Sequence, residues 1–248
     1  ITSSGMPVND ILLEEEVRNL SITAMTGSLG LDMTSDFVEK VSQTTFNAGG
    51  TYQISATPLT NGNVVIAYAD YNNSDYGNLV IYDSAGNEVV SETTFNAGGT
   101  YQISATTLIN ENVLIAYADG VWNNSPGNFV IYDPLGNEVV SETTFNAGSI
   151  ESLTTTTLTN GNVLIAYADG VWNSNNGNFI IYDSVGNEVV SETTFNAGSI
   201  LYLSATTLTN GNILIAYSDY SSLGYGNFVI YDSIGNEVVS ETTFNAGS

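Results

Sequence analysis

The sequence has no cysteine, no histidine and only two cationic residues among its 248 positions. The lack of cysteine excludes a disulfide framework and thiol chemistry, and the lack of histidine removes the commonest general base and transition-metal ligand. Both cations, Arg18 and Lys40, precede residue 41, so the remaining chain carries nineteen of the 26 carboxylates without a positive charge. Such a surface repels phosphates and anionic lipid. We therefore expect no nucleic-acid partner and no membrane insertion, and we expect partners that are cations or neutral groups such as sugars.

A repeat of about 50 residues organises most of the chain. Five phenylalanines recur in register at spacings of 49, 50, 50 and 49: Phe46, Phe95, Phe145, Phe195 and Phe244. A period of this length is typical of propellers and solenoids. We therefore expect a repeat domain over residues 41–248, with repeats at 41–89, 90–139, 140–189 and 190–238 and a partial repeat at 239–248. Residues 1–40 form a non-repeat segment, a cap or connector, in which we expect a short helix at residues 11–20 followed by irregular strands.

Each repeat contains four predicted strands, which in the last copy cover residues 201–208, 212–219, 227–232 and 237–244. The second strand, residues 162–169 in the third copy, is apolar at six consecutive positions, which indicates burial on both faces. The fourth is the most polar. Four antiparallel strands graded from buried to polar describe a propeller blade. The predicted fold is all-β and β-propeller-like, with four or five blades.

Turn residues mark the strand boundaries. Asn-Gly pairs at 61–62, 160–161 and 210–211 predict two-residue type I′ hairpins. The second copy has Asn110-Glu111 instead, so we expect Glu111 either to adopt a positive φ or to widen the loop, and this hairpin to be the most strained of the four. Between the third and fourth strands, an Asp followed by a Gly predicts a type I turn in each copy, at Asp83, Asp133, Asp183 and Asp232.

The polar strand occurs five times, but the other three strands occur four times, so one copy is surplus. Residues 44–47 could complete the last blade and leave residues 242–245 free. Alternatively, residues 1–40 could build a degenerate extra blade, or the array could stay unclosed and pair with another module. A free strand of this kind predicts end-to-end self-association by strand addition, with Phe46 or Phe244 as the buried anchor.

The run Leu-Thr-Asn-Gly-Asn-Val-Leu-Ile-Ala-Tyr-Ala-Asp at residues 158–169, followed by Gly-Asn-Phe-Ile-Ile-Tyr-Asp-Ser-Val-Gly-Asn-Glu-Val at 177–189, resembles a known repeat. It is similar to the β-propeller-like repeats of about fifty residues in large secreted bacterial surface proteins of the RTX-adhesin and type I secretion kind. This resemblance covers residues 41–248. It implies an extracellular, surface-associated and non-enzymatic role.

Two sets of residues are candidates for binding. An aspartate ends each second strand beside other oxygen donors, and could either bind calcium or cap the following turn: Asp70, Asp119, Asp169 and Asp219. The variable loops at 71–77, 120–127, 170–177 and 220–226 hold the two tryptophans among asparagines, a pattern that suggests a sugar-stacking platform or, alternatively, rings that plug the space between blades. The residues of this candidate site are Trp122, Asn123, Asn124, Trp172, Asn173 and Asn175.

An enzyme is the weakest interpretation of these patterns. A glycosidase needs two carboxylates in different environments, whereas the carboxylates here recur at equivalent positions of near-identical copies, so we expect their environments to be alike. Repeated sites suit multivalent binding. We therefore expect a non-enzymatic extracellular protein that is adhesive, structural or filament-forming, with itself or surface glycans as partner. A multivalent lectin is the first alternative and a glycosidase-type propeller the second.

Overall fold

The computed structural model describes residues 22–25, 28–31, 43–120, 125–170 and 175–246. The chain divides into two compact units, Ile1–Ser42 and Gln43–Ser248. In the first unit, β1 (Ile22–Met25) and β2 (Ser28–Leu31) form an antiparallel hairpin. The helix predicted at residues 11–20 lies outside the described residues.

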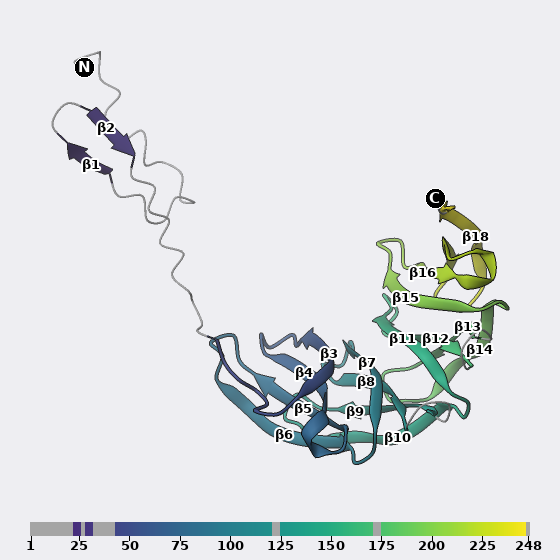
Figure 1. The fold of residues 1–248 in the computed structure, drawn as a ribbon, viewed down its shortest axis with the longest axis horizontal. Helices are drawn as coiled ribbons and strands as arrows, with labels where there is room; N and C mark the ends of the chain where they lie inside the picture. Colours follow the sequence, from purple (N-terminus) through teal and green to yellow (C-terminus); the bar gives the residue numbers. More distant parts are fainter. Residues whose placement is uncertain (1–21, 26–27, 32–42, 121–124, 171–174, 247–248) are drawn as a thin grey trace. The chain divides into compact units, whose positions relative to one another are not determined.

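The second unit consists of four antiparallel sheets, each built from four consecutive strands (Figure 1). Blade 1 contains β3 (Thr51–Pro58), β4 (Val64–Asp70), β5 (Tyr76–Tyr82) and β6 (Glu88–Asn96). Blade 2 contains β7 (Thr100–Thr107), β8 (Val113–Asp119), β9 (Gly127–Tyr132) and β10 (Glu138–Asn146). Blade 3 contains β11 (Ile150–Thr157), β12 (Val163–Asp169), β13 (Asn176–Tyr182) and β14 (Glu188–Asn196). Blade 4 contains β15 (Ile200–Thr207), β16 (Ile213–Asp219), β17 (Tyr225–Tyr231) and β18 (Glu237–Asn245). The predicted all-β, propeller-like fold is confirmed, with four blades.

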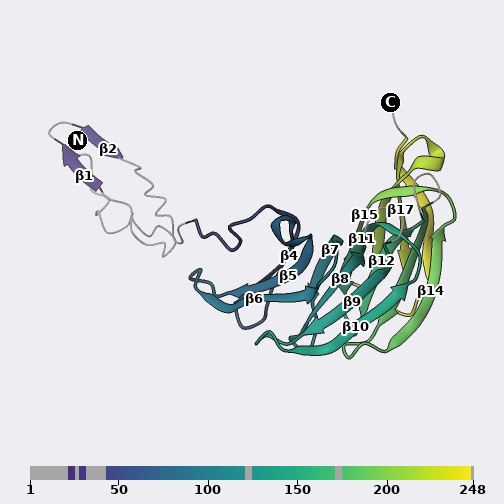
Figure 2. The same cartoon turned by 60° about the horizontal axis from the view of Figure 1, so that its bottom comes forward.

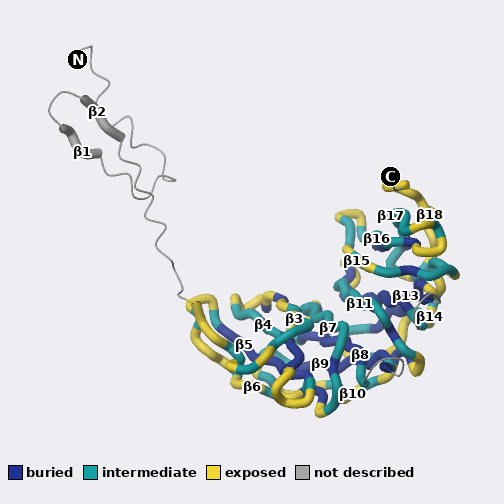
Figure 3. Tube along the Cα trace, viewed as in Figure 1, coloured by how far each residue is buried: buried dark blue, intermediate teal, exposed yellow. Residues whose placement is uncertain are grey.

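The blades pack face to face in chain order, with the inner strands β3, β7, β11 and β15 side by side (Figure 2). In β8 and β12, six consecutive residues are buried because a neighbouring blade covers each face of the strand. In β16, buried residues alternate with partly exposed ones because a blade covers only one face. The outer strands β6, β10, β14 and β18 are largely exposed (Figure 3). The second strand of a blade is therefore buried on both faces where the blade lies between two others, and one face of blade 4 is not covered by another described blade.

The same three side chains meet at each junction between blades. The ring of Phe145, at the end of β10, packs on Tyr167 of β12 with the ring centroids 5.1 Å apart. The Tyr167 hydroxyl donates to Glu192 Oε2 at 2.5 Å. Burial and this bond raise the pKa of the Tyr167 hydroxyl, so it remains a donor. The other two junctions repeat the arrangement with Phe95–Tyr117–Glu142 and Phe195–Tyr217–Glu241.

The surplus copy of the polar strand does not complete the last blade. Residues 242–245 lie in β18 and pair with β17, Thr243 opposite Asn227 and Asn245 opposite Gly226. The prediction that residues 44–47 take this place is wrong. Instead, Phe46 packs on Tyr68 with the ring centroids 5.1 Å apart, which is the contact that Phe95 makes with Tyr117. Of the three alternatives, the array of blades that does not close on itself agrees with this pairing. The alternative of an extra blade built by residues 1–40 concerns residues that lie largely outside the described ranges.

The hairpins after the inner strands differ from the predicted type I′ turns. The Leu59 N–H donates to the Asn63 carbonyl at 2.8 Å, and the Gly62 N–H donates to the Leu59 carbonyl at 3.0 Å. Gly62 has a φ of 87°, whereas Asn61 is not among the residues with positive φ. This is a type I turn followed by one left-handed residue, which also accepts the Asn-Gly pair. The turns that open at Asp83 and its equivalents have the same geometry, as predicted, with Gly86 at a φ of 80°.

Glu111 occupies the left-handed position with a φ of 72°, so of the two alternatives it adopts the positive φ and the loop is not widened. Replacing it with glycine should raise the free energy of unfolding by about 1 kcal/mol, because glycine adopts this conformation without steric strain. Urea denaturation measures the change. Gly62→Glu is the matched reverse variant, since no atom lies within 4 Å of the position that its Cβ would take. It should lower the free energy of unfolding by about as much as Glu111→Gly raises it. A stability unchanged or lowered by Glu111→Gly would show that the Glu111 side chain makes a compensating contact.

Candidate functional site

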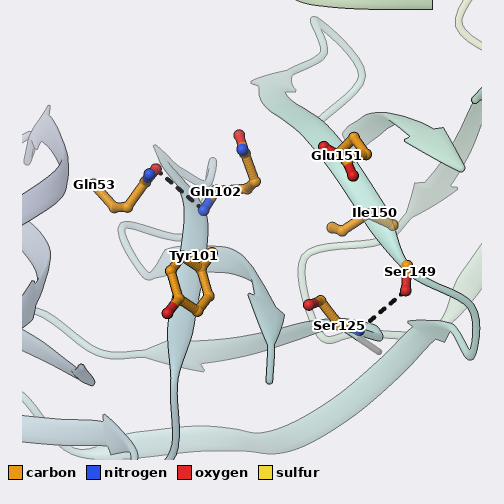
Figure 4. A pocket seen from close by; sticks show the side chains of 7 residues that line it. All are labelled: Gln53, Tyr101, Gln102, Ser125, Ser149, Ile150 and Glu151. Atoms are coloured by element: carbon orange, nitrogen blue, oxygen red, sulfur yellow. Dashed lines mark hydrogen bonds between the residues drawn. The ribbon is translucent and has the colours of Figure 1, made fainter. Parts of the chain in front are cut away.

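A groove lies where the inner strands begin, at the end of the blades that carries the variable loops; we call it the loop-end groove. It consists of two adjoining cavities of about 290 and 380 Å³, which share Gln102 and Glu151. The first is lined, within the described part of the chain, by Gln53, Tyr101, Gln102, Ser125, Ser149, Ile150 and Glu151 (Figure 4). The second is lined by Gln102, Glu151, Ser152, Asn175, Ser199, Leu201, Tyr202 and Tyr220. Inner-strand residues of all four blades therefore border the groove.

Irregular pairing of the inner strands directs side chains into this groove. In blade 2, Tyr101 pairs with Ala118 and Ser104 with Ala116, so Gln102 falls in a break of the ladder and has a φ of 50°. Gln53 and Tyr202 are the equivalent residues of blades 1 and 4, with φ values of 55° and 52°. Left-handed non-glycine residues are strained and concentrate at functional sites. The bulge thus gives each inner strand a side chain at the groove rather than in the sheet.

Glu151 is the carboxylate that lines both cavities. Ile150 pairs with Asp169 and Ser152 with Ala168, so Glu151 is the residue that the ladder of blade 3 omits. In Figure 4 its side chain lies across the cavity from Gln53 and Gln102. Burial raises the pKa of the Glu151 carboxyl above its usual range. A carboxyl of this kind keeps its proton to a higher pH than an exposed carboxyl does, and can deliver it to a bound molecule.

A second carboxylate stands behind the wall of the groove. Asp75 accepts hydrogen bonds from the hydroxyl groups of Tyr52 and Tyr101, the latter at 3.2 Å. Burial and Asp75 raise the pKa of both hydroxyl groups, so both remain donors. The two tyrosine rings stack with centroids 6.4 Å apart. Asp75 therefore fixes the position of Tyr101, which lines the first cavity.

The groove also contains a polar atom that has no partner. Asn175 is only 1% exposed, lines the second cavity, and its Oδ1 atom accepts no hydrogen bond in the described part of the chain. A buried acceptor without a donor is unfavourable. A bound hydroxyl or water molecule would satisfy it, so Asn175 is suited to hold a ligand.

The aspartates predicted to bind calcium or cap turns lie one in each blade: Asp70, Asp119, Asp169 and Asp219. Asp70 accepts the backbone N–H of Asn72 at 3.0 Å, and Asp219 accepts that of Ser221 at 2.8 Å, each capping a 3₁₀ turn, Tyr71–Asn73 and Tyr220–Ser222. Asp119 accepts the side-chain N–H of Asn96 at 2.8 Å. Within the described ranges, no group of three or more acidic residues could hold a metal ion. Asp70 and Asp219 therefore cap the turns that follow them, and calcium binding at the four positions stays a prediction.

The other predicted residues are only partly visible. Trp122, Asn123, Asn124, Trp172 and Asn173 lie outside the described residues, and of the predicted sugar platform only Asn175 is described. Phe46 covers Tyr68, whereas the ring of Phe244 is 64% exposed. Self-association through these two phenylalanines stays a prediction.

Glu151 and Asp75 were missed by the sequence analysis, although the sequence contains a signal for them. Sixteen of the nineteen carboxylates after residue 40 recur in all four copies, and three do not: Asp75, Glu111 and Glu151. Glu111 lies in a hairpin at the opposite end of the blades. In a repeat protein, a departure from the repeat at an inner strand marks the site better than the repeated residues do.

Comparisons with known proteins identify the fold. No family model matches the chain, and no curated protein matches it. Among solved structures, a protein of unknown function from Dyadobacter fermentans aligns with a TM-score of 0.58 at 12% identity over 80% of this chain. An α-L-arabinanase from Penicillium chrysogenum, complexed with arabinobiose, aligns with a TM-score of 0.58 at 14% identity over 78% of this chain. An ulvan lyase of family PL25 aligns with a TM-score of 0.55 at 12% identity over 78% of this chain. The alignments span 69%, 66% and 58% of those chains.

These comparisons correct the functional expectation. Among the structures that share the fold, those whose activity is stated are carbohydrate-active enzymes, so the prediction of a non-enzymatic adhesive or filament-forming protein is wrong. An extracellular location stays a prediction. The resemblance to secreted repeat proteins holds only for the propeller-like fold. In the described part of the chain, no helix is long and apolar enough to cross a membrane.

Proposed function

We propose that the chain binds a glycan in the loop-end groove and hydrolyses it, with Glu151 as the proton donor. The observation that carries the proposal is a carboxylate that breaks the repeat, leaves the strand ladder and enters the groove, where burial raises its pKa. Hydrolysis of a glycosidic bond requires such a group beside the leaving oxygen.

The remaining groove residues suit a sugar chain. Glutamine, serine and asparagine side chains supply hydrogen bonds, and Tyr202, which is 77% exposed, offers an aromatic face at the edge of the second cavity. Glycosidases commonly use a second carboxylate as base or nucleophile. Asp75 is the other repeat-breaking carboxylate at this end, but it lies behind Tyr101 and does not line the groove, so we assign it the positioning of Tyr101. The named arabinanase and lyase of the same fold support a glycan as the substrate.

Incubation with a panel of polysaccharides tests the proposal, with release of new reducing ends and retardation in glycan-containing gels as readouts. We expect turnover of at least one glycan, and we expect Tyr202→Ala to weaken binding about tenfold because the aromatic platform is lost. Ile109→Ala is the control, since Ile109 is also exposed but lies at the opposite end of the blades. Binding without turnover would leave a lectin, and neither binding nor turnover would refute the proposal.

A further inference from the structure

We infer that the loop-end groove accepts a neutral glycan and rejects anionic ones such as polyuronates and sulfated polysaccharides. This inference rests on the function proposed above and adds the class of substrate. It follows from the charges and the hydrogen-bonding groups around the groove.

The charges around the groove are of one sign. The unit Gln43–Ser248 contains no lysine, arginine or histidine. Glu151 enters the groove, Asp75 lies behind Tyr101, and an aspartate ends the second strand of each blade at the same end. A uronate or sulfate that entered would lose its water without gaining a cationic partner, and it would meet negative charge. Rejection of anionic sugars is therefore built into the unit.

The unpartnered atom in the groove points to the same class. Asn175 Oδ1 is a buried acceptor that needs a donor. A carboxylate or sulfate group has acceptor atoms only, whereas a sugar hydroxyl can donate to Asn175 and accept from a neighbouring N–H. The side chains of Gln102 and Ser152, which line the same cavity, are neutral and can act as both donor and acceptor. Hydroxyl groups thus match the groove better than charged substituents.

The same charge distribution favours hydrolysis over elimination. Elimination withdraws a proton beside a uronate carboxylate, and negative charge develops there; cationic side chains, which would stabilise that charge most strongly, are absent from this unit. In hydrolysis, the glycosidic carbon–oxygen bond breaks and the proton of Glu151 passes to the leaving oxygen. The oxygen of a water molecule bonds to the anomeric carbon, and its spare proton passes to the Glu151 carboxylate that the first proton transfer left ionised, so that one water is consumed for each bond.

Binding of neutral and anionic polysaccharides to Glu151→Gln, at low and at high salt, tests the inference. This variant does not consume the ligand, and it has no carboxyl at position 151 that could repel an anion, so rejection of anions is a stringent result. We expect at least one of arabinan, xylan and galactan to bind with an affinity that changes less than about twofold with salt, and polygalacturonate and carrageenan to bind at least about tenfold more weakly at low salt. Leu201→Lys, which adds a cation to the second cavity, should gain salt-sensitive binding of the anionic chains.

The outcomes separate this inference from the proposed function. Turnover of an anionic glycan, or products that absorb ultraviolet light as unsaturated sugars do, would overturn the inference and leave a glycan-active enzyme. Binding of anions that disappears in an Arg18→Gln, Lys40→Gln double variant would also overturn it and would locate the cation in the first unit. If no glycan binds or is cleaved, the proposed function and the inference both fail.

Discussion

Glu151→Gln is expected to lower the turnover of a glycan by about 10²- to 10⁴-fold, the usual contribution of a general acid, and to leave the fold unchanged. Glutamine keeps the size and hydrogen-bonding reach of the side chain but has no proton to give to the leaving oxygen. The groove should therefore still bind the glycan. Steady-state kinetics should show the loss in kcat, with KM changed much less.

The pH profile provides the sharper readout. A proton donor works only while it is protonated, and burial raises the pKa of Glu151, so activity should fall as the pH rises through this raised value. In Glu151→Gln this alkaline limb should disappear. Glu111→Gln is the matched control, because Glu111 also breaks the repeat but lies in an exposed hairpin at the other end of blade 2. Unchanged turnover and an unchanged profile in Glu151→Gln would exclude it as the proton donor.

Phe145→Ala is expected to lower the free energy of unfolding by about 3–5 kcal/mol, the usual result of removing a buried phenylalanine. Its ring is 8% exposed and fills the junction between blades 2 and 3 against Tyr167. The ring lies directly against Gly127, where an added Cβ would be 2.4 Å from it, and glycine has no side chain that could occupy the space left by the ring. Urea denaturation followed by circular dichroism measures the change.

Phe244→Ala supplies a control at the same position of the repeat. Phe244 is 64% exposed, because no blade packs on it among the described residues, so removal of its ring should change stability by less than about 0.5 kcal/mol. A loss as large as that of Phe145→Ala would show that another segment or another molecule covers Phe244 in solution. Light scattering of the wild type and Phe244→Ala would then distinguish a second copy from a contact within the chain.

Much of the fold could be predicted because each local signal agreed with the repeat. The apolar run at residues 162–169 is buried on both faces, as predicted, since blades flank β12 on two sides. The type I′ turns were predicted wrongly because Asn-Gly fits two kinds of hairpin, and only the backbone of Asn61 distinguishes them. Pairing of the surplus strand was equally undecidable, because identical residues at 44–47 and 242–245 compete for the same partner.

The site was predicted less well for a physical reason. The sequence shows that Glu151 replaces an aromatic or leucine residue of the other copies, Tyr52, Tyr101 and Leu201. It does not show that the ladder of blade 3 skips this residue, because a β-bulge depends on the backbone of both paired strands. Nor does it show that the Oδ1 atom of Asn175 is buried and accepts no hydrogen bond from the described residues. Of the predicted ligand-binding residues, Asn175 is the one that the structure brings to the groove.

The repeated Phe–Tyr–Glu junction has a consequence for how this gene can evolve. Recombination between near-identical copies, such as the segments encoding residues 90–139 and 140–189, would add or delete a whole blade in frame. The inserted blade would meet its neighbours through a junction that already occurs three times, so no new core would have to arise. Because every blade also brings one inner strand to the groove, each duplication would lengthen the groove by one unit. Copy number, rather than point mutation, would then set how long a ligand homologous proteins can hold.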